Sequence, residues 1–233
     1  MKFNNRNNAE REKYSMFNFL CVALLLGSIW GFFEVFFKDV LSMGGTPFAS
    51  SIMTGIGVFM MAIGYGLFKR AGSFFIISLF AILTRMIIVP VLGCSPMCRA
   101  NAAVALLLLG ASTAVAFSLF ERVSKNQNKT GGIVAGGGVL FSGTAYYFAG
   151  LACAPCQYLK NFVAQGGLMT FLSVEVLWWS LFSAVLFYPG YLAGIKLQGT
   201  VSALHETRPV PYYAALVSAS IVVMFVTGLI LVP

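Results

Sequence analysis

The chain has 233 residues, of which 59% are hydrophobic and only 9% are charged. Its mean hydropathy is +0.86. A water-soluble domain of this composition could not cover its surface with polar side chains, so that class is excluded. The net charge of +8 does not indicate nucleic-acid binding, because the basic residues lie in short segments between apolar runs. We therefore expect an all-α integral membrane protein in a lipid bilayer.

The N-terminal segment differs in composition from the rest of the chain. Residues 1–15 are polar and contain Lys2, Arg6, Arg11 and Lys13, which predicts a short cytoplasmic tail. The apolar run that follows, residues 16–37, is longer than the apolar part of a signal peptide and has no clear small-residue cleavage site. We therefore expect it to be a retained first span, and residues 16–233 to form a single transmembrane helical domain.

Seven apolar runs follow one another along the chain. Each has about 19 to 26 residues, enough for a helix to cross a hydrocarbon core of roughly 30 Å. The prediction is a bundle of six to seven transmembrane helices, and Pro189 and Gly190 are expected to kink or end the sixth one. The predicted spans are residues 16–37, 50–68, 73–93, 101–120, 133–152, 168–193 and 212–232.

The distribution of basic residues predicts the orientation. With seven spans, eleven Lys and Arg residues lie in the tail and on one side, and three (Lys38, Arg99 and Lys160) lie on the other. Because cytoplasmic segments carry the excess of basic residues, we expect a multi-pass protein of the cell membrane with its N-terminus in the cytoplasm. The segments after the third and fifth spans then face outward.

Four of the five cysteines lie in these two outward segments, as CSPMC at Cys94 and Cys98 and as CAPC at Cys153 and Cys156. Four interpretations stay open, and the first is that the cysteine side chains only pack against their neighbours. The cysteines can form structural disulfides, since an exoplasmic space is oxidising. They can bind a soft metal ion such as Cu(I) or zinc, which thiolates suit. They can also form a redox-active dithiol pair.

Three ionisable residues fall inside predicted spans: Glu34, Arg85 and Glu175. Charged side chains in hydrocarbon are costly and usually face a bundle interior or a cavity, paired with one another. All three are expected in the outer half of the membrane. Either Arg85 pairs with Glu175 and only fixes helix packing, or the three residues line an outward-opening polar pocket. Trp178 completes the predicted substrate-binding set.

Small residues are spaced four apart on the first span, at Ala23, Gly27 and Gly31. This spacing puts them on one helix face, where small side chains let another helix approach closely in lipid. The neighbouring helix can belong to the same chain or to a partner membrane protein.

The segment GSIWGFFEVFFKDVL at residues 27–41, the glycine-rich second span and the basic Lys69-Arg70 turn together resemble the substrate-binding S components of energy-coupling-factor (ECF) transporters. In that family the pocket opens outward, capped by the loops after spans one, three and five, and a membrane coupling subunit with ATPases supplies energy. The resemblance implies that Ala23, Gly27 and Gly31 dock to that subunit. It also implies that Glu34, the Gly44-Gly45 loop and both cysteine segments form the pocket and its lids.

No Walker A, HExxH or GxSxG motif occurs in the sequence, so we do not expect the chain to hydrolyse ATP by itself. The leading hypothesis is a membrane transport subunit that captures a vitamin-like solute or metal ion outside and is energised by partner subunits. The alternative is a membrane thiol-disulfide oxidoreductase that uses the paired cysteines. A third hypothesis is an assembly subunit with no ligand of its own.

Overall fold

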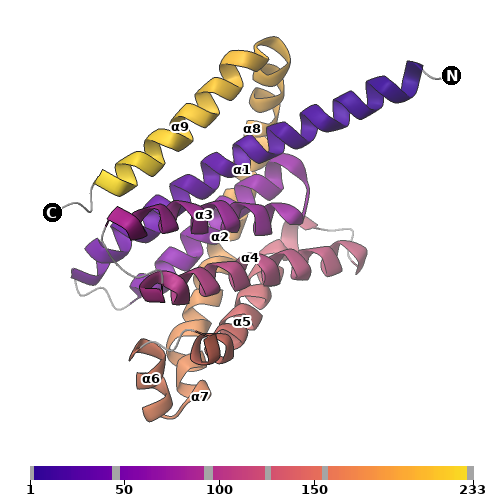
Figure 1. Ribbon diagram of the computed structural model, residues 1–233. Coiled ribbons are helices and arrows are strands. Elements are labelled where there is room, and N and C mark those ends of the chain that lie inside the picture. The colour runs from indigo at the N-terminus through magenta and orange to yellow at the C-terminus, as the bar shows by residue number, and fades with distance from the viewer. Residues whose placement is uncertain (1–2, 44–47, 92–96, 124–126, 154–156, 230–233) are drawn as a thin grey trace.

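The computed structural model describes residues 3–43, 48–91, 97–123, 127–153 and 157–229. Within these ranges the chain is helical, with short turns and no strand, which confirms the predicted all-α class (Figure 1). The elements in chain order are α1 (Phe3–Met43), α2 (Ala49–Phe68), α3 (Gly72–Val91), α4 (Met97–Val123), α5 (Gln127–Cys153), α6 (Gln157–Ala164), α7 (Leu168–Phe171), the π-helical turn η1 (Leu172–Val176), α8 (Leu177–Thr207) and α9 (Pro209–Leu229).

Six helical segments are long and apolar enough to cross a membrane. They are Met16–Phe37, Ala49–Phe68, Ala100–Glu121, Thr130–Ala152, Leu168–Thr207 and Pro209–Leu229. Helix α3 contributes a shorter apolar segment, Gly72–Ile87. Since α3 itself has 20 residues, we interpret it as a further crossing. The described chain is therefore a multi-pass helical bundle, as predicted.

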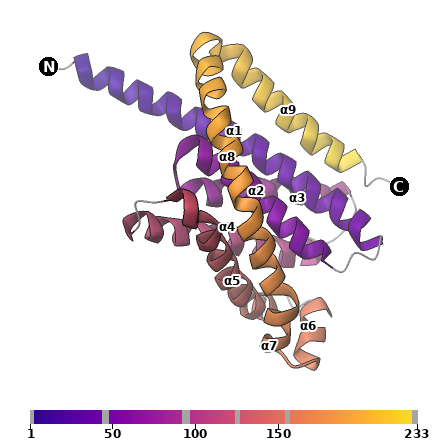
Figure 2. The same cartoon turned by 180° about the vertical axis from the view of Figure 1, so that it is seen from behind.

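The helix that contains the sixth predicted span is longer than that span. Helix α8 continues through Pro189 and ends at Thr207, so neither Pro189 nor Gly190 ends it. The continuous helical segment Leu168–Thr207 has 40 residues and is about 60 Å long at the α-helical rise. Because this is twice the hydrocarbon thickness of about 30 Å, the polar C-terminal part of α8 must extend beyond the bilayer core (Figure 2).

The predicted N-terminal tail is also part of a helix. Helix α1 begins at Phe3 and has 41 residues, so the tail continues the first span without a break. Both views show this end of α1 projecting away from the other helices (Figures 1 and 2).

The closest helix pair is α2 with α8. A Cβ atom added to Gly194 on α8 would lie 2.3 Å from the carbonyl oxygen of Ile63 and 2.9 Å from Cα of Gly66, both on α2. Glycines therefore bring the two backbones into direct contact, as expected where helices pack in lipid. This contact also explains why Pro189 does not end α8: the flanking Gly190 packs on the carbonyl oxygen of Phe59 and tertiary packing holds the helix in place.

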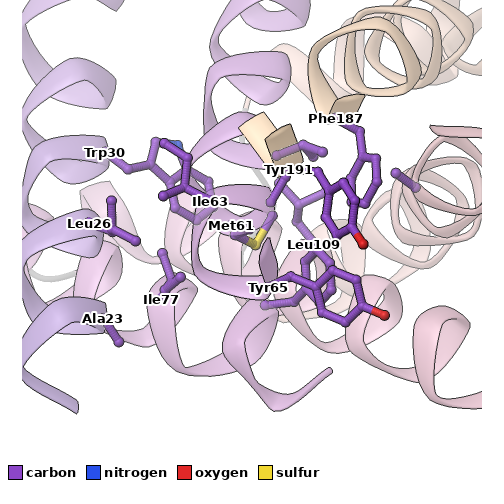
Figure 3. Close-up of a cluster of buried hydrophobic side chains, with 14 of the residues drawn as sticks. Ala23, Leu26, Trp30, Met61, Ile63, Tyr65, Ile77, Leu109, Phe187 and Tyr191 are labelled. Carbon is purple, nitrogen blue, oxygen red and sulfur yellow. The ribbon is translucent and has the colours of Figure 1, made fainter. Parts of the chain in front are cut away.

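Large side chains fill the centre of the bundle. Trp30, Tyr65, Phe74 and Phe117 are among the largest that are almost fully buried, and they come from α1, α2, α3 and α4. Figure 3 shows part of this cluster, with Tyr65 beside Tyr191 of α8. The ring centroids of Phe74 and Phe117 are 4.6 Å apart, so offset ring packing joins α3 to α4.

Helix α9 is the most loosely held of the long helices. It lies along α1 (Figures 1 and 2) and contacts α3 and α8 less. Only Ser220 and Thr227 are buried among its described residues, so most of its surface is left for lipid. The other helices do not depend on α9 for their core.

Reporter fusions test the predicted orientation. With seven crossings the two ends of the chain lie on opposite sides of the membrane, so alkaline phosphatase fused after Pro233 should be active outside. The same reporter fused after Arg208, upstream of α9, should be inactive, and green fluorescent protein at that position should fluoresce. An inactive phosphatase at both positions would contradict the seven-crossing topology.

Candidate functional site

Two of the predicted site residues form a buried ion pair. Nη1 of Arg85 on α3 donates a hydrogen bond to Oε2 of Glu34 on α1, at 2.9 Å, and the two side chains are only 6% and 10% exposed. The predicted pairing of Arg85 with Glu175 is therefore wrong. The two residues do not meet because their helices are not neighbours in the bundle. Helix α1 packs on α3, whereas η1, which carries Glu175, packs mainly on α2, α5 and its own neighbours along the chain.

The small-residue stripe brings this ion pair together. A Cβ atom added to Gly27 would lie 2.5 Å from Cβ of Phe80, and one added to Gly31 would lie 2.7 Å from Cβ of Thr84. Ala23 is 1% exposed. The stripe is therefore covered by α3 of the same chain. The resemblance implied that the stripe docks to a partner subunit, and this prediction is wrong. Glu34 lies one turn beyond the stripe, opposite Arg85.

The ion pair leaves part of the Arg85 guanidinium unused. The Nε atom of Arg85 is buried and has no hydrogen-bond partner among the described residues. An unpaired buried donor costs about 1 to 3 kcal/mol, and more when the group is charged. A hydrogen-bond acceptor that reached Nε would recover that free energy.

Glu175 is held by a different set of neighbours. Its Oε2 atom accepts hydrogen bonds from Oγ of Ser50 at 2.6 Å and from Nε1 of Trp179 at 3.1 Å. The residue is half-buried and lies in the π-helical turn η1. Such turns are rare and occur frequently at functional sites. Ser50 follows the segment between α1 and α2, so Glu175 connects the N-terminal end of α2 to η1.

Trp178 lies on the same side of the helix as Glu175, three residues further along. Its ring contacts Phe48, with centroids 4.6 Å apart, and the side chain is 38% exposed. No basic side chain pairs with Glu175 in the part of the chain that the structure describes. No hydrogen bond or ion pair joins this group to the Glu34–Arg85 pair within that part either. The predicted set is thus divided between two clusters.

A polar network at the predicted inner end was missed by the sequence analysis. The hydroxyl of Tyr65 donates to Oε1 of Glu121 at 2.7 Å, and Nζ of Lys69 donates to the hydroxyl of Tyr191. Lys69 ends α2 in a left-handed conformation with φ 52°. The network joins α2 to α4 and α8. Its only sequence signal was the position of Lys69 and Tyr191 at predicted inner span ends.

A groove of about 230 Å³ also lies at the predicted inner end, between α1, α2 and the extension of α8. His205 in this groove contacts the rings of Tyr212 and Tyr213. None of the predicted site residues lines the groove. Its lining residues are Asn18, Leu67, Phe68, Gln198, Val201, Ser202, His205 and Glu206.

The cysteine motifs and the glycine loop lie outside the described residues. Cys98 is in the first turn of α4 and Cys153 is the last residue of α5, but their side chains, Cys94, Cys156 and the Gly44-Gly45 loop are not described. Disulfide formation, binding of a soft metal ion and redox activity all stay predictions. Among the described residues, no group of three or more His, Cys, Asp and Glu side chains is placed to hold a metal ion.

No known protein family, curated protein or solved structure matches this chain. The likeness to S components stays a resemblance in residues 27–41, the second span, the Lys69-Arg70 turn and the order of spans. Any assignment of function therefore depends on the side-chain clusters described above.

Proposed function

We propose that the protein is a membrane transport subunit that captures a small solute from the outer side and is energised by partner subunits. The observation that carries this proposal is a set of ionisable side chains inside an apolar bundle, with binding capacity that the described side chains do not use. Arg85 has a buried unpaired Nε, and Glu175 has a carboxylate without a basic partner among the described residues.

The free-energy cost of burying these groups supports a ligand. An ionised side chain at the centre of a bilayer costs a few kcal/mol even on the mildest scale, and such residues commonly mark a solute pathway. Helix packing alone does not require the Glu34–Arg85 pair, because a buried ion pair can often be replaced by apolar residues at little cost in stability. A solute acceptor at Arg85 and a solute donor or cation at Glu175 would each satisfy a group that is now unsatisfied.

Each charged group is also held from a second helix, as a selective site requires. Glu34 on α1 orients Arg85 on α3, and Ser50 on α2 orients Glu175. With the predicted orientation both clusters lie in the outer half of the bundle. In this proposal the segments that contain the cysteine pairs cap the pocket, as the resemblance implies, and a membrane coupling subunit with ATPases drives release inward.

Solute capture tests this proposal. The protein in lipid nanodiscs is incubated with a defined mixture of labelled vitamins and metal ions, and retained solutes are measured by mass spectrometry. Wild type should retain a solute, and Glu34→Gln with Arg85→Gln should retain at least tenfold less, because the double variant removes both charges together. Glu121→Gln, at the inner network, is the matched control and should retain as much as wild type.

Two results would contradict the proposal. One is wild-type protein that retains nothing from the mixture. The other is retention that the double variant leaves unchanged, which would assign the ion pair to packing alone. Purification from native membranes adds a separate check, because an energised transport subunit should co-purify with a second membrane protein and an ATPase.

A further inference from the structure

We infer that the captured solute is a monovalent organic cation, bound by the Glu175 carboxylate beside the aromatic wall formed by Trp178 and Phe48. This inference depends on the proposed function, since it names the chemical class of its solute.

Charge balance is the first step. Glu34 and Arg85 neutralise each other at 2.9 Å. Glu175 has no basic partner, so among the described side chains these two clusters together carry one net negative charge. A partly buried carboxylate without a counter-ion is costly in a low-dielectric bundle. A solute with one positive charge would supply the missing counter-ion.

The hydrogen bonds of Glu175 are the second step. Both go to Oε2, from Ser50 and Trp179, and no hydrogen bond from the described residues reaches Oε1. Two donors on one oxygen fix the orientation of the carboxylate. Oε1 is left as the acceptor for a positively charged group. Trp179 has no acceptor, and Oγ of Ser50 both donates to Glu175 and accepts from Trp179. One free carboxylate oxygen offers fewer ligands than a metal ion needs, so the site suits an ammonium group better.

The aromatic neighbours are the third step. Trp178 lies three residues after Glu175 and packs against Phe48, with ring centroids 4.6 Å apart. Its 38% exposure leaves ring surface for contact. Tryptophan gives the strongest cation–π attraction of the three aromatic side chains, and aromatic walls beside a carboxylate are the usual way to bind a quaternary ammonium. A strongly hydrated inorganic ion would gain less from such a wall.

Binding of tetramethylammonium to the protein in lipid nanodiscs tests the inference. Calorimetry should show saturable binding to wild type and no binding of neopentyl alcohol, which has a similar shape and no charge. Glu175→Gln should weaken binding at least tenfold while it keeps a hydrogen-bond acceptor for Ser50. Trp178→Leu should also weaken binding, and Trp178→Phe should restore part of it. Glu121→Gln should bind as wild type does, and thermal unfolding should confirm that each variant is folded.

The outcomes separate the two claims. If wild type retains a solute from the labelled mixture but binds no tetramethylammonium, the cation is wrong and solute capture stands. If tetramethylammonium binds equally to wild type and to folded Glu175→Gln, the assigned site is wrong. If tetramethylammonium binding is lost in Glu175→Gln although wild type retains no solute from the mixture, the cation site stands and the proposed solute capture is contradicted.

Discussion

Replacing Arg85 with Ala is expected to lower the free energy of unfolding by about 3 to 5 kcal/mol, because it leaves the Glu34 carboxylate buried without its partner. The buried position of both side chains makes this one of the largest effects expected of any single substitution in the described bundle. Thermal unfolding of purified protein in detergent micelles would measure it as a large fall in Tm. Glu34→Ala should have a similar effect, since it leaves the guanidinium unpaired.

The double variant Glu34→Leu with Arg85→Met separates charge from packing. Replacing a buried ion pair with apolar residues of similar size is often neutral or stabilising. The double variant should therefore unfold close to the wild-type Tm, while it still loses solute capture. If the double variant were as unstable as the two single losses combined, the ion pair would not be the source of the effect.

Gly194→Ala is expected to destabilise the bundle by about 3 kcal/mol, at the upper end of the usual cost of overpacking. The new Cβ would lie 2.3 Å from the carbonyl oxygen of Ile63, and backbone atoms cannot move aside as a flexible side chain can. Because α2 and α8 form the closest helix pair, a shift there would disturb the whole bundle. Thermal unfolding under the same conditions measures the loss.

Gly199 is a matched control on the same helix. A Cβ atom added there meets nothing within 4 Å, so Gly199→Ala gains helix propensity of up to about 1 kcal/mol. We expect the same or a higher Tm. An equal fall in Tm for Gly194→Ala and Gly199→Ala would show that the effect at position 194 does not come from the close approach of α2 and α8.

Hydropathy predicted the membrane class and the approximate positions of the apolar helices, because apolar length is a local property of the chain. The end of α8 could not be predicted this way. Pro189 is unfavourable inside an isolated helix, and the contact of Gly190 with α2 that holds the helix together depends on a helix far away in sequence. The helical form of the N-terminal segment was missed for a related reason: its polar composition indicates position relative to the membrane and not backbone conformation.

The candidate site was predicted in part. Ionisable residues in apolar runs identified Glu34, Arg85 and Glu175, but the choice of partner depends on which helices are neighbours. The stripe at Gly27 and Gly31 was recognised as a helix contact, yet spacing alone does not say whether the contact lies within the chain. Trp179 lies four residues after Glu175, a spacing that indicates contact on a helix. Ser50 comes from another helix and had no local signal.

The π-helical turn at Leu172–Val176 has a consequence for the phase of the helix. A π turn accommodates one residue more than an α turn, and each α-helical residue corresponds to a rotation of 100°. Because the π turn absorbs this residue, the helical segments on its two sides keep their relative orientation although one residue more stands between them. The same extra residue in a regular α-helix would rotate the two sides relative to each other by about 100°. The π turn therefore lets Glu175 face Ser50 without changing how the glycines of α8 pack on α2.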